Sequence, residues 1–249
     1  MDRHHDAAEL LLSARRDPAQ RLTALPEALR PRTEEQAYLI QREVIGKIGE
    51  IGGWKVGSPG PAADSFNCAP LAAKGILPSP AEVACGDRGI EAEIAVRLGT
   101  DLPARDHPYT EAEVLAAIAS AHPAIEVLDS RYTDPDAVDP LSNLADSLSH
   151  CALVLGPAVP NWQGIDLAHE EVRVLVDGTE IKRRTANPAG NMMRLLLWLA
   201  NTGARWAGGL KAGQVVTTGS WTGKEFVDPE AEARVRFAHA GEAVVRFVS

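Results

Sequence analysis

Two glutamates in residues 90–96 (sequence IEAEIAV) are the side chains of this chain best placed for chemistry. Apolar residues alternate there with Glu91 and Glu93, and this period of two predicts a β-strand with a carboxylate-bearing face. Side chains two residues apart on a strand project from the same face about 7 Å apart. Two carboxylates at this spacing can share one hard cation, and Mg²⁺ or Mn²⁺ prefers such oxygen ligands.

A third acidic ligand would come from elsewhere in the fold, and Glu126 is the best candidate. It stands between apolar neighbours in residues 122–129, a second predicted strand. A glutamate buried in a sheet is unfavourable unless something pairs with it. Two structural alternatives stay open: Glu91 and Glu93 could line the solvent face of a half-buried antiparallel strand, and Glu126 could pair with Arg131.

The composition is that of an ordinary soluble globular protein. The chain has 249 residues, of which 45% are apolar and 24% are charged, enough to bury a real core. Its 25 basic and 34 acidic residues give a net charge of −9, and no basic run exceeds residues 182–184, which argues against a nucleic-acid partner. No apolar stretch approaches the roughly 20 residues of a membrane-spanning helix, and the N-terminus is unlike a secretory or transit signal. We expect a cytoplasmic protein without a membrane partner.

Helix and strand signals alternate along the chain around these glutamates. Two residue pairs have the spacing of capping boxes at helix starts: Thr33 with Gln36, and Thr110 with Glu113. The predicted helices are residues 6–16, 33–47, 110–121 and 187–203. The other predicted strands are residues 53–57, 151–155, 172–176, 180–184, 214–218, 232–238 and 243–248. Residues 59–82 lack clean periodicity, which indicates a long loop with one short strand at most, and the turns around residues 53–57 would expose Lys55.

A family resemblance rests on six short segments: residues 37–41 (AYLIQ), 53–57 (GWKVG), 90–95 (IEAEIA), 123–131 (PAIEVLDSR), 144–146 (LAD) and 217–220 (TTGS). In this order they resemble the 2-keto-4-pentenoate hydratases, which belong with the 4-oxalocrotonate decarboxylases in the fumarylacetoacetate hydrolase superfamily. The resemblance implies an α+β fold with a mixed, rolled β-sheet core, like the C-terminal part of fumarylacetoacetate hydrolase, and flanking helices. We expect a small helical N-terminal part over residues 1–60 and a catalytic β-rich domain over residues 61–249.

The resemblance also implies a divalent metal, usually Mg²⁺, held by the positions that here are Glu91, Glu93 and Glu126. This ligand set agrees with the strand pattern. In the family the metal chelates the 2-oxo or 2-enol oxygen and the carboxylate of a small 2-oxo acid, and it polarises both as a Lewis acid. Lys55, in the Gly-x-Lys-x-Gly motif, is implied as an acid, a base or a carboxylate-binding group. By composition alone it would be a solvated surface lysine.

Four further positions match the motifs of the family. Ser220 follows a predicted strand and could place its hydroxyl or backbone N–H at the substrate carboxylate, although a turn serine fits the pattern nearly as well. Arg131 is assigned to substrate binding. Asp129 and Asp146 are expected to brace the site through hydrogen bonds from behind it. The resemblance further implies a homo-oligomer.

Two departures from the family pattern concern the activation of water. Residues 70–78 offer Lys74 and no carboxylate, whereas hydratases of the family usually carry acidic residues there that help hold a base. The family's Ala-Asp-Asn is Ala-Asp-Ser over residues 145–147. The first hypothesis is a Mg²⁺-dependent hydro-lyase acting on a short 2-hydroxydienoate or 2-oxo-enoate, with its water-activating base unidentified.

Three alternatives stay open beside hydration. A vinylogous 2-oxo acid decarboxylase needs the same electron sink. A C–C bond hydrolase would need a base for water, and His122 is the only histidine close to a metal motif. A non-catalytic partner subunit in a mixed oligomer would have no need of clustered carboxylates.

Overall fold

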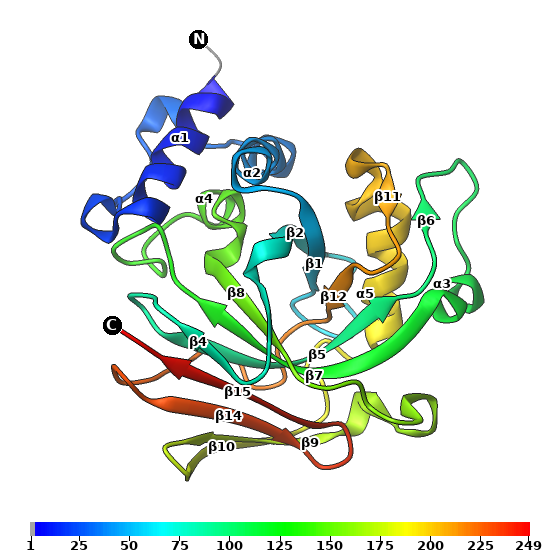
Figure 1. The fold of residues 1–249 in the computed structure, drawn as a ribbon. Coiled ribbons are helices and arrows are strands. Elements are labelled where there is room, and N and C mark those ends of the chain that lie inside the picture. Colours follow the sequence, from blue (N-terminus) through cyan, green and yellow to red (C-terminus); the bar gives the residue numbers. More distant parts are fainter. Residues whose placement is uncertain (1–2) are drawn as a thin grey trace.

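A computed structural model describes residues 3–249, and Figure 1 shows their arrangement in layers. Two N-terminal helices lie on one side of a large central sheet, and a smaller sheet lies on the other side. The helices are α1 (Arg3–Arg16), α2 (Glu34–Ile48), α3 (Glu111–Ala117), α4 (Pro140–Ala145) and α5 (Met192–Trp198). No helix in this described range is long and apolar enough to cross a membrane.

The central sheet is mixed, and most of its neighbouring strands are not consecutive in the chain. In spatial order it contains β2 (Asn67–Ala72), β1 (Ile51–Gly57), β12 (Val215–Thr217), β5 (Gly89–Leu98), β7 (Ile118–Leu128), β8 (His150–Leu155) and β3 (Ile76–Pro78), with β13 (Glu225–Phe226) paired to β5. Strands β1 and β12 are parallel, as are β3 and β8, whereas β5 and β7 are antiparallel. The expected α+β class with a mixed sheet core is therefore confirmed.

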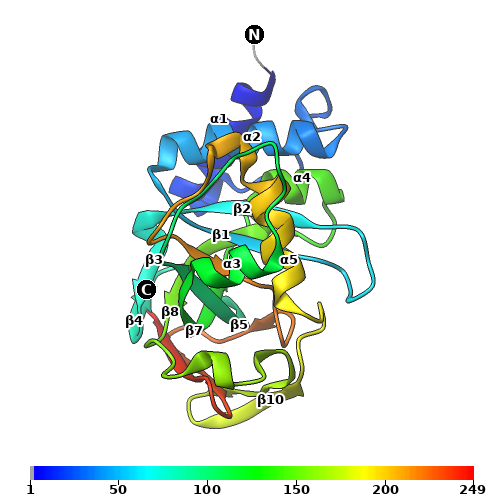
Figure 2. The same cartoon turned by 90° about the vertical axis from the view of Figure 1, so that its right-hand side faces the viewer.

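The second sheet covers one face of the first. Its order is β10 (Thr179–Thr185), β9 (Glu171–Val176), β14 (Glu232–Phe237), β15 (Gly241–Phe247) and β4 (Ala81–Val83). Strands β14 and β15 pack against β7, and a separate short pair joins β11 (Gly209–Leu210) to β6 (Leu102–Pro103). Figure 2 shows α3 and α5 crossing the side of the molecule, where they contact each other and the central sheet. These layers bury the middle of β5 and β7 on both faces.

The N-terminal helices pack on a small core of their own, in which Leu11, Ile40 and Tyr132 are buried. Gln41 of α2 is buried as well, and its side-chain amide donates to the carbonyl oxygen of Leu144 at the end of α4. Strand β1 follows α2 directly and is an internal strand of the central sheet. The helices are thus joined to the sheet, and a domain division at residue 60 stays a prediction.

Two sequence predictions of secondary structure are wrong. Residues 59–82 are not one loop, because they contain β2, which pairs with the preceding β1, and β3 and β4, whose partners β8 and β15 lie far away in the sequence. The helix predicted from Asn187 begins at Met192, where the side chain of Asn191 caps it. Asn187 forms a turn instead, accepting a hydrogen bond from the backbone N–H of Ala189.

The helix predicted over residues 110–121 is correct at its start and too long at its end. Both hydrogen bonds of the capping box between Thr110 and Glu113 are present. The helix ends at Ala117, and β7 begins at Ile118 because its register with β5 extends back to that residue. Tertiary pairing therefore overrides the local helical pattern at this boundary.

Candidate active site

Three glutamates from the two central strands converge on one point. Glu91 and Glu93 lie on β5, and Glu126 of β7 lies opposite Glu91 in the register of the sheet. One carboxylate oxygen from each residue lies within 4.8 Å of the others. Glu93 is 2% exposed and Glu91 is half-buried, so the two do not line a solvent face, and Glu126 is 0% exposed.

The surroundings of these carboxylates fit a bound cation. One oxygen of Glu93 and one oxygen of Glu126 are buried without any hydrogen-bond partner. Burial first, and the neighbouring Glu126 second, raise the pKa of both Glu91 and Glu93. Buried carboxylates that repel one another and have unpaired oxygens are stabilised by a shared divalent ion. The donor set consists of oxygens, which suits Mg²⁺ or Mn²⁺.

Lys55 is buried, and the prediction that turns would expose it is wrong. The residue is 9% exposed, and its ammonium lies 2.7 Å from the carboxylate of Glu126. On β1 the side chains of Trp54 and Val56 enter the apolar core, so the alternation of the strand directs Lys55 to the opposite face. Burial alone would lower the pKa of Lys55, but Glu126, followed by Glu91 and Glu93, raises it above its ordinary value.

Glu126 has a second partner, His150, which the sequence analysis did not select. Its Nδ1 lies 2.8 Å from the carboxylate of Glu126, and the imidazole is buried. Burial acts to raise the pKa of Glu126, but Lys55 and then His150 lower it to about 2. Arg131 was the partner considered from the sequence, and the structure pairs it with Asp146 instead.

The carboxylates open into a cavity of about 420 Å³, which we call the catalytic cavity. Lys55 and Ser220 line it together with the three glutamates. Ser220 also hydrogen-bonds Glu91, and this contact acts to lower the pKa of that carboxyl. Further polar residues that line the cavity carried no periodic or motif signal in the sequence: Ser58, Ser65, Asn67, Asn143 and Lys224.

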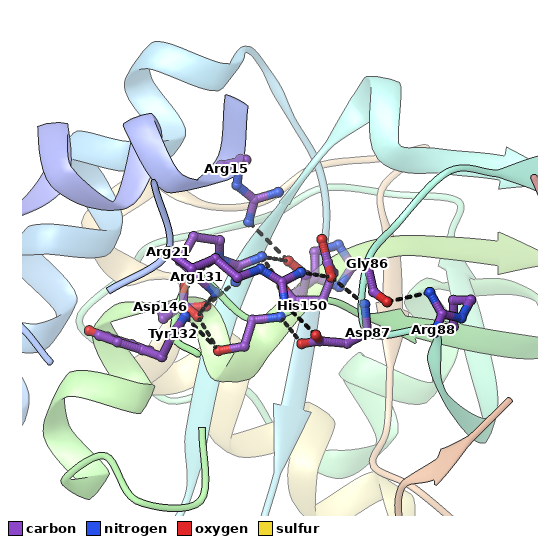
Figure 3. Close-up of polar contacts among 11 residues, drawn as sticks. Arg15, Arg21, Gly86, Asp87, Arg88, Arg131, Tyr132, Asp146 and His150 are labelled. Atoms are coloured by element: carbon purple, nitrogen blue, oxygen red, sulfur yellow. Dashed lines mark hydrogen bonds and ion pairs between the residues drawn. The ribbon is translucent and has the colours of Figure 1, made fainter. Parts of the chain in front are cut away.

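Arg131 does not line the catalytic cavity. It is 3% exposed, and Figure 3 shows its guanidinium enclosed by polar partners. It donates to the carboxylate and the backbone carbonyl of Asp146 and to the carbonyls of Asp129 and His150. Direct substrate binding by Arg131 thus has no support in this geometry, because these acceptors already occupy its donors.

Asp129 and Asp146 do not line the catalytic cavity. Asp146 accepts from Arg131 (Figure 3), and Asp129 accepts from Arg21 at 2.5 Å. Arg21 also pairs with Asp87, and neither of these two residues was selected from the sequence. Arg21 belongs to the segment between α1 and α2, so its two ion pairs fasten the N-terminal part to Asp87 before β5 and to Asp129 after β7.

Two regions considered for water activation lie away from the catalytic cavity. No residue of 70–78 lines it; Lys74 lines a different cavity, beside α1 and α2. The imidazole of His122 does not line it either, and its nitrogens hydrogen-bond the hydroxyl of Ser120 and the carbonyl of Gly156. These positions give no support to His122 as the base of a C–C hydrolase.

Comparison with known proteins places the chain in a family. Residues 72–248 match the family described as fumarylacetoacetate (FAA) hydrolase C-terminal. The chain belongs to this family. It is 37% identical over 132 residues to a 2-keto-4-pentenoate hydratase of Burkholderia vietnamiensis, a match of 53% of this chain and 49% of that protein. The match thus spans about half of the length of that relative.

Two further relatives extend the match within the superfamily. A 2-keto-4-pentenoate hydratase of Dechloromonas aromatica is 28% identical over 232 residues, which are 86% of both proteins. A 4-oxalocrotonate decarboxylase of Pseudomonas putida is 32% identical over 161 residues, 64% of this chain and 60% of that protein. The resemblance to hydratases and decarboxylases of the superfamily is thus confirmed.

Solved structures show the same fold. The 4-oxalocrotonate decarboxylase from Pseudomonas putida G7, complexed with magnesium and adipate, matches with a TM-score of 0.83 and 25% identity over 98% of this chain and 97% of that chain. A fumarylpyruvate hydrolase from Pseudomonas aeruginosa, in complex with Mn²⁺ and pyruvate, matches with a TM-score of 0.59 and 16% identity over 78% of this chain and 88% of that chain. At that identity the second likeness concerns the fold alone.

Proposed function

We propose that this chain is a divalent-metal-dependent lyase that acts on a short 2-oxo acid conjugated to a carbon–carbon double bond. Glu91, Glu93 and Glu126 would hold Mg²⁺ or Mn²⁺, and the observation that carries the proposal is their convergence with two buried, unpartnered oxygens beside a buried lysine. When bound, the metal supplies Lewis-acid polarisation of the 2-oxo and carboxylate oxygens of the substrate. The hydratase and decarboxylase relatives, and the magnesium complex of a solved relative, support this assignment.

Lys55 is the proposed proton carrier. Its ammonium lines the catalytic cavity, and its ion pair with Glu126 fixes the direction of Nζ. A charged lysine there can donate a proton to a substrate carbon or hold the substrate carboxylate. Ser220, Asn67 and Asn143 are proposed to orient the substrate, because each lines the cavity with a hydrogen-bonding side chain.

Arg131, Asp129 and Asp146 are proposed as positioning residues. Arg131 holds the backbone carbonyl of His150 at 2.9 Å, and the imidazole of His150 holds Glu126. Asp146 in turn orients Arg131. This chain of contacts fixes the third glutamate from behind, as outer hydrogen bonds do at metal sites.

Vinylogous decarboxylation is a second candidate reaction, and the lining of the cavity favours it. Hydration needs a group that takes a proton from water. Apart from the three glutamates, none of the cavity residues within 3–249 is a carboxylate or an imidazole. Decarboxylation requires an electron sink and a proton for the resulting carbanion, and Lys55 can supply that proton. Hydration is favoured instead by two 2-keto-4-pentenoate hydratases that are 37% and 35% identical over 132 residues.

The experiment compares two substrates with the same purified protein. We expect turnover of 2-keto-4-pentenoate or of 4-oxalocrotonate with Mg²⁺ or Mn²⁺ and none after chelation, measured by ultraviolet absorbance and by release of carbon dioxide. Release of carbon dioxide from 4-oxalocrotonate without any turnover of 2-keto-4-pentenoate would select decarboxylation. Lack of turnover of both substrates, together with lack of metal-dependent oxalate binding, would overturn the proposal and favour a non-catalytic partner subunit.

A homo-oligomer is also proposed, on the family resemblance. Leu115 and Phe226 are large apolar side chains that are 44% and 60% exposed, and an interface would cover such groups. Sedimentation equilibrium of the purified chain measures its state of assembly directly.

A further inference from the structure

A second cavity, of about 410 Å³, lies between the N-terminal helices and the central sheet. We call it the basic cavity, because the side chains with a permanent charge that line it are Arg15, Arg16, Lys47 and Lys74. Within the described range of the chain, no aspartate or glutamate lines it. This is unexpected in a chain whose net charge is −9.

The four cations are incompletely neutralised. Arg15 donates to the backbone carbonyl of His150 at 2.9 Å (Figure 3), and Lys47 lies 4.0 Å from the carboxylate of Glu9. In the part of the chain that the structure describes, Arg16 and Lys74 have no ion pair within 4.0 Å. Burial first, and Arg131 second, lower the pKa of Arg15 to about 10. The basic cavity therefore gathers four cations with few carboxylate partners, and an anion would find complementary charge there.

The floor of the basic cavity is apolar. Leu12 of α1 and Val44, Ile45 and Ile48 of α2 contribute aliphatic side chains to it. Another cavity, of about 500 Å³ beside Met192, is also largely apolar but has no lysine or arginine among its described lining residues. Of these two cavities, only the basic one combines aliphatic side chains with lysines and arginines among its described lining residues. This combination suits a ligand with an anionic head and a hydrocarbon body.

The wall of the basic cavity is shared with the catalytic cavity. Ser147 and His150 line the basic cavity, whereas Leu148 lines the catalytic one. Ser147, Leu148 and Ser149 have φ of 54°, 55° and 65°, a left-handed conformation that non-glycine residues rarely adopt. Such strained backbone persists where the surrounding structure imposes it, and it is frequent at functional sites. An occupant of the basic cavity would therefore lie against the residues that separate the two cavities.

We propose that the basic cavity is a binding site for a small organic anion with an apolar body, distinct from the catalytic cavity. The carboxylate, sulfonate or phosphate head would lie among Arg15, Arg16 and Lys74. The hydrocarbon part would lie on Leu12 and Ile45. Neither the metal nor the proposed lyase reaction enters this inference, because it rests on the lining of a different cavity.

The test uses 1-anilinonaphthalene-8-sulfonate, an anion with an apolar body whose fluorescence rises when it is bound. We expect saturable binding to the purified full chain that weakens as salt is added. Arg16→Glu and Lys74→Glu should each weaken binding about three- to five-fold, the upper part of the range for the loss of one exposed charge contact. Both side chains are exposed, so neither change should disturb folding, which thermal unfolding monitors.

The matched control is Arg184→Glu, which makes the same change of charge at an exposed site. Arg184 lies on β10, on the side of the molecule opposite to α1 and α2 (Figure 1). Binding of the probe should change less than two-fold in this variant. Equal affinities in all three variants would overturn the proposal and assign the probe to a surface without lysine or arginine, such as the cavity beside Met192. Displacement of the probe by oxalate and Mg²⁺ without an effect of the rim variants would assign it to the catalytic cavity, and would also overturn the proposal.

Discussion

The catalytic cavity and the basic cavity lie on opposite sides of residues 147–150 and gather opposite charges by different means. The carboxylates of Glu91, Glu93 and Glu126 extend from the hydrogen-bonded strands β5 and β7 and cannot separate. Two unit charges 4.8 Å apart repel by about 3 kcal/mol at an effective dielectric constant of 20. The cations of the basic cavity lie on helices and a turn. Arg16, Lys47 and Lys74 are exposed, so salt screens their charges.

Because of this difference, one charge cluster requires a ligand and the other does not. The buried glutamates have unpaired oxygens and must take up protons or a cation. The exposed lysines and arginines are stable in water, so they attract a ligand without requiring one. We therefore expect substitutions in the catalytic cavity to have larger effects than those at the rim of the basic cavity.

Glu93→Gln should have the largest effect. Glutamine keeps the volume and removes one anionic ligand, so metal-dependent turnover should fall at least about a thousand-fold, equivalent to about 4 kcal/mol. Steady-state kinetics measure the loss of turnover, and calorimetric titration with MgCl₂ and MnCl₂ measures the loss of metal affinity. Glu82→Gln is the matched control, because Glu82 is exposed on β4. This variant should leave turnover and metal affinity unchanged. Full activity of Glu93→Gln would contradict the metal assignment.

Lys55→Met should lower both turnover and stability. It removes the proposed proton carrier, which is expected to cost about a hundred-fold in rate. It also leaves the buried Glu126 without its ammonium partner, and should lower the free energy of unfolding by about 3 kcal/mol. Urea unfolding in the presence of a chelator measures this loss.

A second variant separates the two effects of Lys55→Met. In the double variant Lys55→Met, Glu126→Gln, the carboxylate that loses its ammonium partner is replaced by a neutral amide, so most of the stability should return while turnover stays low. Wild-type turnover in Lys55→Met would remove this residue from the mechanism.

Asp146→Asn should have a smaller effect on stability, about 2 kcal/mol. The change weakens the charge-assisted hydrogen bond with Arg131, whose other donors keep their carbonyl acceptors. If Arg131 positions Glu126 through His150, metal affinity should also decrease, whereas a purely structural role would leave it unchanged. Calorimetric metal titration of the folded variant distinguishes the two outcomes.

Ser147→Gly should have the smallest effect, a gain of about 1 kcal/mol in the free energy of unfolding. Glycine adopts the left-handed conformation of this residue without the penalty of a Cβ atom. Ser142→Gly, five residues earlier in helix α4, is the control and should destabilise by about 1 kcal/mol. A loss of stability in Ser147→Gly would show that the serine side chain stabilises the fold by more than its left-handed backbone conformation destabilises it.

Parts of the fold and the site could be predicted because their signals are local. The period of two over residues 90–96 predicts β5 with both glutamates on one face, and the capping pattern at Thr110 predicts the start of α3. The hairpin of β9 and β10 follows from Asp177 and Gly178, a two-residue turn between alternating segments. In each case the residues that decide the structure are close together in the sequence.

Local pattern selects the candidate metal ligands, because period and apolarity indicate two carboxylates on one strand and one buried glutamate on another, and the family resemblance implies the same three residues. Long-range packing, in contrast, buries Lys55 against Glu126 and makes His150 the second partner of this glutamate. It also pairs Arg131 with Asp146, and it brings Lys74 beside Arg15 and Arg16. These contacts join segments that are far apart in the chain, and pairing of strands and packing of helices, not local pattern, set which charged groups meet.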